Sequence, residues 1–262
     1  MQQWKVLFTK ELKESLRNYK WLWIPVVFVL LGITQPLTSY YFADIIEQFG
    51  ALPEGAVVDI PPPTSAEVLA GTLGQFNQIG LLVLVLAFMG TVAAEKNDGT
   101  LIMVLAKPVA HFNYLTAKWV HVLVLAVSSF LLGYAAAVYY TFLLIGPISF
   151  SQVVTSALVY SLWLCFVMTL AVCLSALLNS SGLAAFATLA TALILSIAGI
   201  YAPDLVKGSP GMLTVYSEQY LYAGEPEDGF WLGVILTAGL IFILMSATIY
   251  LFKNQEAGKN AG

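Results

Sequence analysis

Six long apolar stretches, none of which contains Asp, Glu, Lys or Arg, dominate this chain. An α-helix of roughly 20 apolar residues crosses the hydrocarbon core of a membrane, and each stretch is near that length or longer. Helices satisfy their own backbone hydrogen bonds in lipid, so we expect each stretch to form one transmembrane helix. The expected spans are residues 21–42, 76–94, 119–145, 153–178, 183–201 and 231–252.

The scarcity of charge points the same way. Charged residues make up 10% of the 262 residues and hydrophobic residues 59%. A soluble domain carries about 25% charged residues, because its surface must be solvated by water. The chain is therefore predicted to be an all-α, multi-pass membrane protein in which residues 21–252 form one six-helix transmembrane domain.

The basic residues are distributed unevenly along the chain. If the chain crosses the membrane six times, every Lys and Arg except Lys207 falls on one side. Because cytoplasmic loops are enriched in Lys and Arg, we expect both termini in the cytoplasm, including a tail at residues 253–262. The cell (plasma) membrane is the expected location.

Residues 1–20 are predicted to form an amphipathic helix beside the first span. Half of its helical wheel is apolar, whereas the basic side chains face largely elsewhere. Such a helix suits the headgroup layer of the cytoplasmic leaflet, and the alternative is an extension that packs on the membrane domain. The apolar half consists of Trp4, Leu7, Phe8, Leu12, Leu16 and Tyr19.

Two further segments are expected on the opposite side. In the loop at residues 43–75, the part from 65 to 75 can form a short helix capped by Ser65. The segment at 202–230 has enough apolar and aromatic residues to enter the membrane partly as short helices, and its tyrosines suit the interface.

The loop at residues 95–118 is the most informative stretch. Asp98 can cap a short helix that shows an apolar face from Leu101, Val104 and Leu105 and ends before Pro108. Such a helix, lying crosswise at the cytoplasmic surface, offers a soluble partner a place to dock. An ordinary interfacial loop is an equally open alternative.

Together with the topology, this loop resembles the permease subunit of ABC-2 type ATP-binding cassette exporters. Its residues follow the E…GTL…L…P…K pattern of that family, although His111 stands near a usual basic position and Ala117 where glycine is frequent. The matching positions are Glu95, Gly99, Thr100, Leu101, Leu105, Pro108 and Lys118.

The resemblance carries several implications. Residues 95–108 would be the coupling helix region that docks on a separate nucleotide-binding ATPase subunit. Residues 202–230 would form short re-entrant helices at the outer face. A second permease subunit, identical or related, would complete the translocation pathway as a dimer.

Several kinds of chemistry have no counterpart in the sequence. It contains neither a G-x-x-x-x-G-K-[ST] phosphate loop nor an H-E-x-x-H zinc motif. We therefore expect no enzyme activity, metal site or cofactor in this chain and no nucleic-acid partner, with ATP and Mg bound by the partner subunit. His111 and His121 are expected to be structural.

Uncharged polar residues remain as candidates for a pathway. Gln35 lies in the first span, and a ridge of small residues repeats every four positions in the fifth, which permits close helix approach. The ridge either packs within one subunit or forms a dimer interface beside the pathway. It consists of Ala184, Thr188, Ala192 and Ser196.

These observations predict a membrane-spanning permease subunit of an ATP-driven exporter. Ion-coupled transporters generally keep charged groups inside the membrane, and the six stretches have none, so the energy source is expected to lie outside the chain. The alternatives are a non-ABC channel or transporter, and a membrane-embedded regulatory or immunity protein. The uncharged spans favour an amphipathic or hydrophobic cargo.

Overall fold

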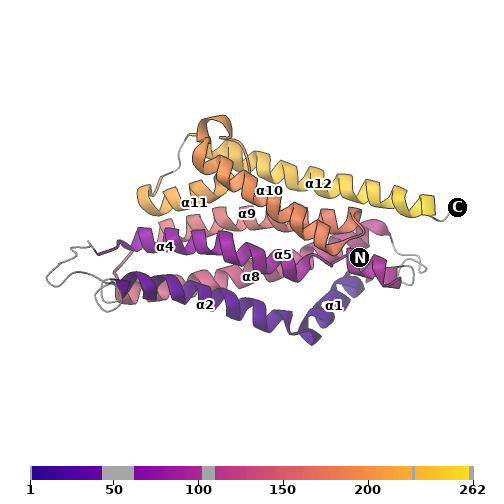
Figure 1. The fold of residues 1–262 in the computed structure, drawn as a ribbon, viewed down its shortest axis with the longest axis horizontal. Helices are drawn as coiled ribbons and strands as arrows, with labels where there is room; N and C mark the ends of the chain where they lie inside the picture. Colours follow the sequence, from indigo (N-terminus) through magenta and orange to yellow (C-terminus); the bar gives the residue numbers. More distant parts are fainter. Residues whose placement is uncertain (1, 43–61, 102–109, 226–227, 260–262) are drawn as a thin grey trace, which may run out of the picture.

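The computed structural model describes residues 2–42, 62–101, 110–225 and 228–259. Within this part the chain is helical without strands, and six helices or helical runs are long and apolar enough to cross a membrane. They lie side by side along the long axis of the molecule (Figure 1). The predicted all-α fold with six spans is thus confirmed. The spans are Lys20–Tyr40, Ser65–Asn97, His111–Leu144, Phe150–Leu177, Ser181–Tyr201 and Phe230–Gln255.

Four of these spans are single helices, namely α2 (Lys20–Tyr40), α8 (His111–Leu144), α9 (Phe150–Leu177) and α10 (Ser181–Tyr201). The last span belongs to α12 (Phe230–Lys259). Helix α9 is central, since it packs against α8, α10, α11 and α12. Its side chains Tyr160 and Trp163 are almost completely buried.

Helices α2 and α8 approach each other more closely than side chains would allow. A Cβ atom added at Gly32 would lie 2.1 Å from the carbonyl oxygen of Gly133, and one added at Gly133 would lie 2.5 Å from the carbonyl oxygen of Phe28. Only glycine fits at both positions, so these two residues set the distance between the helices.

The second span begins earlier than its hydropathy predicts. It consists of α4 (Ser65–Gln75), a π-helical turn (Phe76–Gly80), α5 (Leu81–Phe88), a non-helical turn and α6 (Ala93–Asn97). The cap is Thr64 rather than Ser65: the Thr64 hydroxyl accepts from the Glu67 N–H at 3.3 Å, and the Glu67 carboxylate accepts from the Thr64 N–H at 2.7 Å. This capping box starts the second span itself, because α4 continues through the π-helical turn into α5 instead of forming a separate short helix.

Helix α1 (Gln2–Arg17) lies at one end of the bundle, at a steep angle to the spans (Figure 1). It packs on α8 and α2. Its apolar residues Trp4, Leu7, Phe8 and Leu12 are partly buried, whereas Leu16 is 53% and Tyr19 69% exposed. The predicted helix is present, and most of its apolar half faces protein.

The segment between α10 and α12 contains a 3₁₀ turn (Pro203–Leu205) and α11 (Met212–Ala223). Helix α11 lies at the end of the bundle opposite α1 and packs on α9 and α4 (Figure 1). It buries Leu213, Tyr216 and Leu221 there. We call these two ends of the bundle the α1 end and the α11 end.

Candidate functional site

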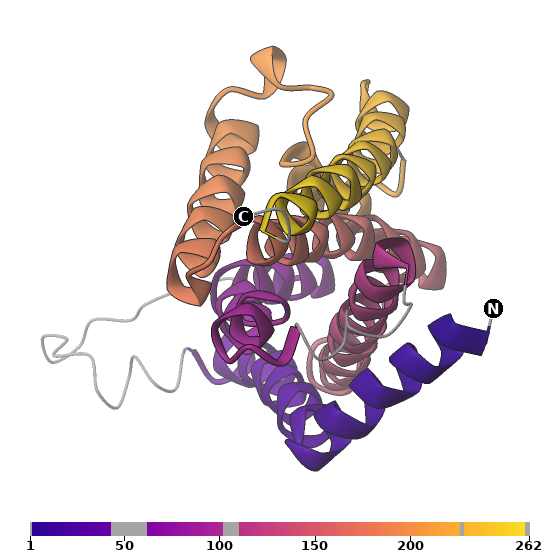
Figure 2. The same cartoon turned by 90° about the vertical axis from the view of Figure 1, so that its right-hand side faces the viewer.

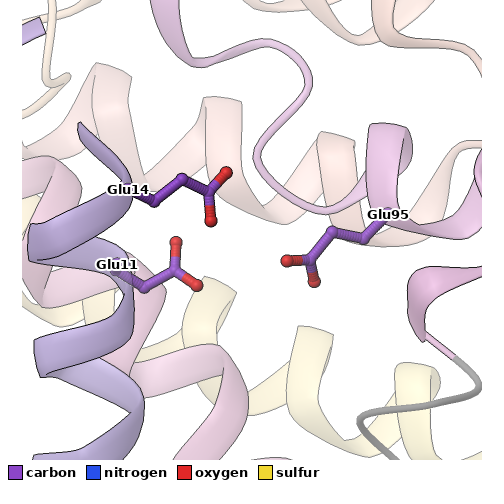
Figure 3. Close-up of side chains that lie close together, drawn as sticks. All are labelled: Glu11, Glu14 and Glu95. Atoms are coloured by element: carbon purple, nitrogen blue, oxygen red, sulfur yellow. The ribbon is translucent and has the colours of Figure 1, made fainter. Parts of the chain in front are cut away.

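Oppositely charged side chains from three separate segments meet at the α1 end. Helix α1 contributes one ammonium group and two carboxylates, α6 contributes one carboxylate and α8 one ammonium group. Figure 3 shows the three glutamates, which point from two segments toward a common space. We call this set the charge cluster; it consists of Lys10, Glu11, Glu14, Glu95 and Lys118.

Glu95 is the centre of the charge cluster, because both of its carboxylate oxygens are used. Oε1 lies 2.6 Å from the Lys10 ammonium and 3.1 Å from the Lys118 ammonium. Oε2 accepts a hydrogen bond from the Tyr114 hydroxyl. The position of Glu95 in the first turn of α6 allows it to reach α1 and α8 at once.

Lys118 is the most deeply buried charge in the cluster, with a side chain only 3% exposed. A buried charge is tolerated when it is paired and hydrogen-bonded. Glu11 is a second partner of Lys118 beside Glu95, since its Oε1 lies 2.9 Å from the Lys118 ammonium. Lys118 therefore joins α8 to both α1 and α6.

Lys10 remains charged in this environment. Burial by itself would lower the pKa of its ammonium, but the hydrogen bond to Glu95 and the charges of Glu11, Glu95 and Glu14 raise that pKa above its ordinary value. Partial burial of the Lys10 ammonium is tolerated because the three carboxylates stabilise its charged form. Lys10 thus ties α1 to a segment 85 residues away in sequence.

The three glutamates also have the spacing of a cation site, since their carboxylate oxygens lie within 4.8 Å of one another. The Lys10 ammonium, however, is 3.3 Å from Glu11, 3.6 Å from Glu14 and 2.6 Å from Glu95. This ammonium supplies the positive charge that the three carboxylates share. We therefore interpret the arrangement as an ion-pair network.

One serine holds the break in the second span. Between α5 and α6, at residues 89–92, the helix is interrupted. The Ser175 hydroxyl on α9 accepts from the N–H groups of Val92 and Ala93, both at 3.1 Å, and donates to the Met89 carbonyl at 2.8 Å. It thereby satisfies backbone groups that the interruption leaves without helical partners.

Two lysines bind carbonyl groups near helix C-termini at the same end. The Lys20 ammonium donates to the Ala87 carbonyl at 2.7 Å, and the Lys96 ammonium donates to the Ala176 carbonyl. Cations are favoured at these ends, where backbone carbonyls lack helical donors. The beginning of the 95–118 loop is thus fastened to α9 as well as to α1 and α8.

The structure describes five of the seven positions that carry the family pattern. Glu95 and Lys118 are in direct contact, and Leu101 is buried beside Tyr114 and Phe252 in a small core. Gly99 has a φ of +71°, a left-handed conformation that favours glycine. Thr100 donates to the Glu95 carbonyl at 3.3 Å. Leu105 and Pro108 lie outside the described residues, as does Val104.

Asp98 plays a different part from the one expected. It ends α6, and its N–H donates to the carbonyl of Ala94 at 2.9 Å. The left-handed Gly99 follows directly and turns the chain before the next helical residues, Thr100 and Leu101. A helical segment does begin within the loop, but after Gly99.

The comparison with known proteins covers nearly the whole chain. Residues 5–257 match the family described as ABC-2 family transporter protein. The chain belongs to the ABC-2 family. It is also similar to an uncharacterized transmembrane protein, YxlG, of Bacillus subtilis (strain 168), with 33% identity over 251 residues that cover 96% of this chain and 97% of YxlG. The resemblance seen in the sequence is confirmed, and the chain is a multi-pass membrane component of a transporter.

The charge cluster of this ABC-2 protein lines a cavity of about 630 Å³ beneath α1. His121 lies at the edge of this cavity and is 4% exposed. Its Nε2 is 2.8 Å from the Ser15 hydroxyl, and its ring meets those of Phe8 and Trp21 edge-on. His121 is therefore a packed, hydrogen-bonded residue that helps to seat α1 on α8.

The small-residue ridge of the ABC-2 protein lies inside the subunit. Its four members are between 0% and 5% exposed, and α10 packs on α9, α11 and α5. Asn77 donates to the Ser196 hydroxyl at 3.2 Å and accepts from the Trp163 indole at 2.9 Å. Gln35 lies elsewhere, against Gly71 of α4. These contacts favour packing within one subunit; the ridge consists of Ala184, Thr188, Ala192 and Ser196.

Sequence reasoning missed the part of α1 in this site. It used Lys10 as a marker of topology and assigned no role to Glu11, Glu14 or Ser15. Two signals were present: a lysine directly before an apolar span, Lys118, needs a partner if it is buried, and two glutamates stand in an otherwise basic helix.

Proposed function

We propose that this ABC-2 protein is the permease subunit of an ATP-driven exporter in the cell membrane, with both termini in the cytoplasm. A separate ATPase subunit, which binds ATP and Mg, docks on the 95–118 loop. A second permease subunit, identical or related, completes the translocation pathway. The observation that carries this proposal is the charge cluster, which connects the start of that loop to two other helices.

The cluster gives docking a mechanical consequence. A load applied to the loop acts on Glu95, whose carboxylate is bound to Lys10 on α1 and Lys118 on α8. Helix α8 is 34 residues long, so it extends about 50 Å and reaches the α11 end. Displacement of the loop would therefore move α8 as a rigid rod instead of being lost in a flexible connection.

The neighbours of α8 would carry this displacement across the bundle. Helix α8 packs against α2 along the close approach at Gly32 and Gly133, and it also packs against α9. Because packed helices shift as bodies, the state of the ATPase would be transmitted to the end where α11 lies. The second permease subunit would use a surface other than the buried ridge on α10.

The first experiment is gentle purification of the tagged protein from its native membrane, with the bound chains identified by mass spectrometry. We expect to recover a soluble subunit that carries a phosphate loop. Recovery of the folded protein alone would contradict the proposal and favour a channel or a regulatory membrane protein.

The second experiment tests the docking site after reconstitution with that ATPase. Glu95→Gln should reduce permease-dependent ATP hydrolysis at least about tenfold, because the acceptor of the Lys10 ammonium loses its negative charge and the hydrogen bond becomes weaker. Glu225→Gln is the matched control, since Glu225 is exposed at the α11 end, and it should leave the rate unchanged. Equal rates for both variants would place the coupling site elsewhere.

A further inference from the structure

Helix α1 has a second face that the charge cluster does not use. Glu11 and Ser15 point toward α8, whereas the opposite side of the helix is exposed. Val6 is 69% exposed and Leu16 53% on that side. We call it the outer face of α1; it consists of Lys5, Val6, Thr9, Lys13, Leu16 and Arg17.

The outer face is basic and uncompensated. Among the described residues, no carboxylate lies within 4.0 Å of the charged groups of Lys5, Lys13 and Arg17. The acidic residues of the helix, Glu11 and Glu14, are instead engaged with Lys118 and Lys10. Both glutamates of the helix thus lie in the charge cluster with Lys10, whereas Lys5, Lys13 and Arg17 lie on the side that faces away from the protein.

The fold places the outer face at the level where the membrane begins. Only Asn18 and Tyr19 separate α1 from the first span, and Tyr19 turns the chain with a φ of 56°. Figure 2 shows α1 running along the edge of the bundle rather than across its centre. Its free side therefore meets the lipid headgroups that surround the α1 end.

We propose that the outer face of α1 binds anionic phospholipid headgroups. Lys5, Lys13 and Arg17 supply ammonium and guanidinium donors for phosphate oxygens. Val6 and Leu16 are exposed on the same face as these basic residues, and they contact the glycerol and upper acyl region of the lipids, as apolar residues do in other interfacial helices. The occupant is a membrane lipid and not a soluble protein, because α1 leads directly into a span.

The binding itself does not require an ATPase, so it goes beyond the proposed function. It has one consequence that rests on that function: lipid bound to the outer face would fix the helix that also carries Lys10 and Glu11. Anionic lipid would then support coupling through the charge cluster.

The test uses the full-length protein in nanodiscs of phosphatidylcholine with increasing phosphatidylglycerol. A fluorophore sensitive to polarity is attached at Thr9→Cys, with Cys165 and Cys173 replaced by alanine. We expect the emission to shift as phosphatidylglycerol is added and the shift to be reversed by salt. Replacing Lys5, Lys13 and Arg17 together by glutamine should leave at most about a tenth of the shift at the phosphatidylglycerol content that gives half of it in the unmodified face, since each basic residue near a membrane contributes roughly fivefold to binding.

The control exchanges Lys5→Arg, Lys13→Arg and Arg17→Lys, which keeps the charge and should keep the lipid response. The same response to both lipids, or an unchanged titration in the glutamine variant, would overturn the proposal. A shift that appears only when the ATPase subunit is added would also overturn it and assign the outer face to that subunit. Because the readout needs no ATP, its failure leaves the coupling proposal standing, and failed coupling leaves this result intact.

Discussion

The two ends of the bundle use the same kinds of residues in different ways. At the α1 end, ion pairs connect segments far apart in sequence, as Lys10 and Glu95 do across 85 positions. At the α11 end, the bonds of two charged side chains are local: the Glu67 carboxylate accepts from the Thr64 N–H, and Lys207 pairs with Asp204 at 3.1 Å, each across three positions. Local contacts specify where a helix starts or turns, whereas long-range contacts hold separate helices together.

Burial follows the same division. Lys118 at the α1 end is 3% exposed, while the Lys207 and Asp204 side chains at the α11 end are 51% and 89% exposed. Exposed pairs contribute little to stability, whereas loss of one partner from a buried pair is costly. The α1 end therefore resists separation of its segments, as the proposed transmission of a displacement requires. Four variants test this difference between the two ends, and their expected effects decrease in the order Glu95→Ala, Ser175→Ala, Glu218→Gln and Thr64→Ala.

Glu95→Ala should have the largest effect. It removes the acceptor for Lys10, Lys118 and Tyr114 in one step. We expect a loss of about 3 kcal/mol in the free energy of unfolding, at the lower end of the range for a broken buried pair because Glu11 still contacts Lys118. Denaturant unfolding in detergent measures the loss. A change no greater than that of Glu225→Ala would remove the distinction between the two ends.

Ser175→Ala should cost about 2 kcal/mol, because two N–H groups and one carbonyl at the break of the second span lose their partner. Ser161→Ala on the same helix is the control, since that hydroxyl donates only to the carbonyl of Ala157. Hydrogen exchange of residues 89–93 should accelerate in the first variant and not in the second. Equal exchange in both variants would show that the serine does not hold the break.

The division between local and long-range contacts also explains what the sequence could predict. The spans were predictable because membrane thickness sets their length and lipid their composition. The capping box was present in sequence as Thr64-Ser65-Ala66-Glu67, and the pattern of a threonine three residues before a glutamate would have found it. Hydropathy alone placed the start of that span 11 residues too late.

Pairing across the bundle was not predictable from spacing. The family resemblance selected Glu95 and Lys118, but nothing in the sequence states that Lys10 and Glu11 would meet them. The partner of the ridge on α10 was not predictable from spacing either, because small residues at every fourth position permit a close approach within a chain or between chains. Only the packing of α10 on α9, α11 and α5 favours the first.

Glu218 at the α11 end tests whether burial without a partner has a smaller effect. Burial raises the pKa of this half-buried carboxyl to about 7. The folded protein then binds a proton that the unfolded chain has released, so stability falls as pH rises from about 4.5 to about 7 and levels off above that. Glu218→Gln should remove this slope and stabilise the protein at pH 8 by about 1–2 kcal/mol. Parallel pH profiles of unfolding for both proteins would contradict the assignment.

Thr64→Ala should have the smallest effect, about 1 kcal/mol, which is typical for loss of one N-cap. Thr64→Ser keeps a hydroxyl acceptor for the Glu67 N–H and should retain most of the stability. Because the capping box acts within three residues at the α11 end, neither variant should change ATP hydrolysis coupled to the permease. If Thr64→Ala reduced coupling as strongly as Glu95→Gln, the start of the second span would belong to the transmission path. The long-range contacts at the α1 end would then not be its distinguishing feature.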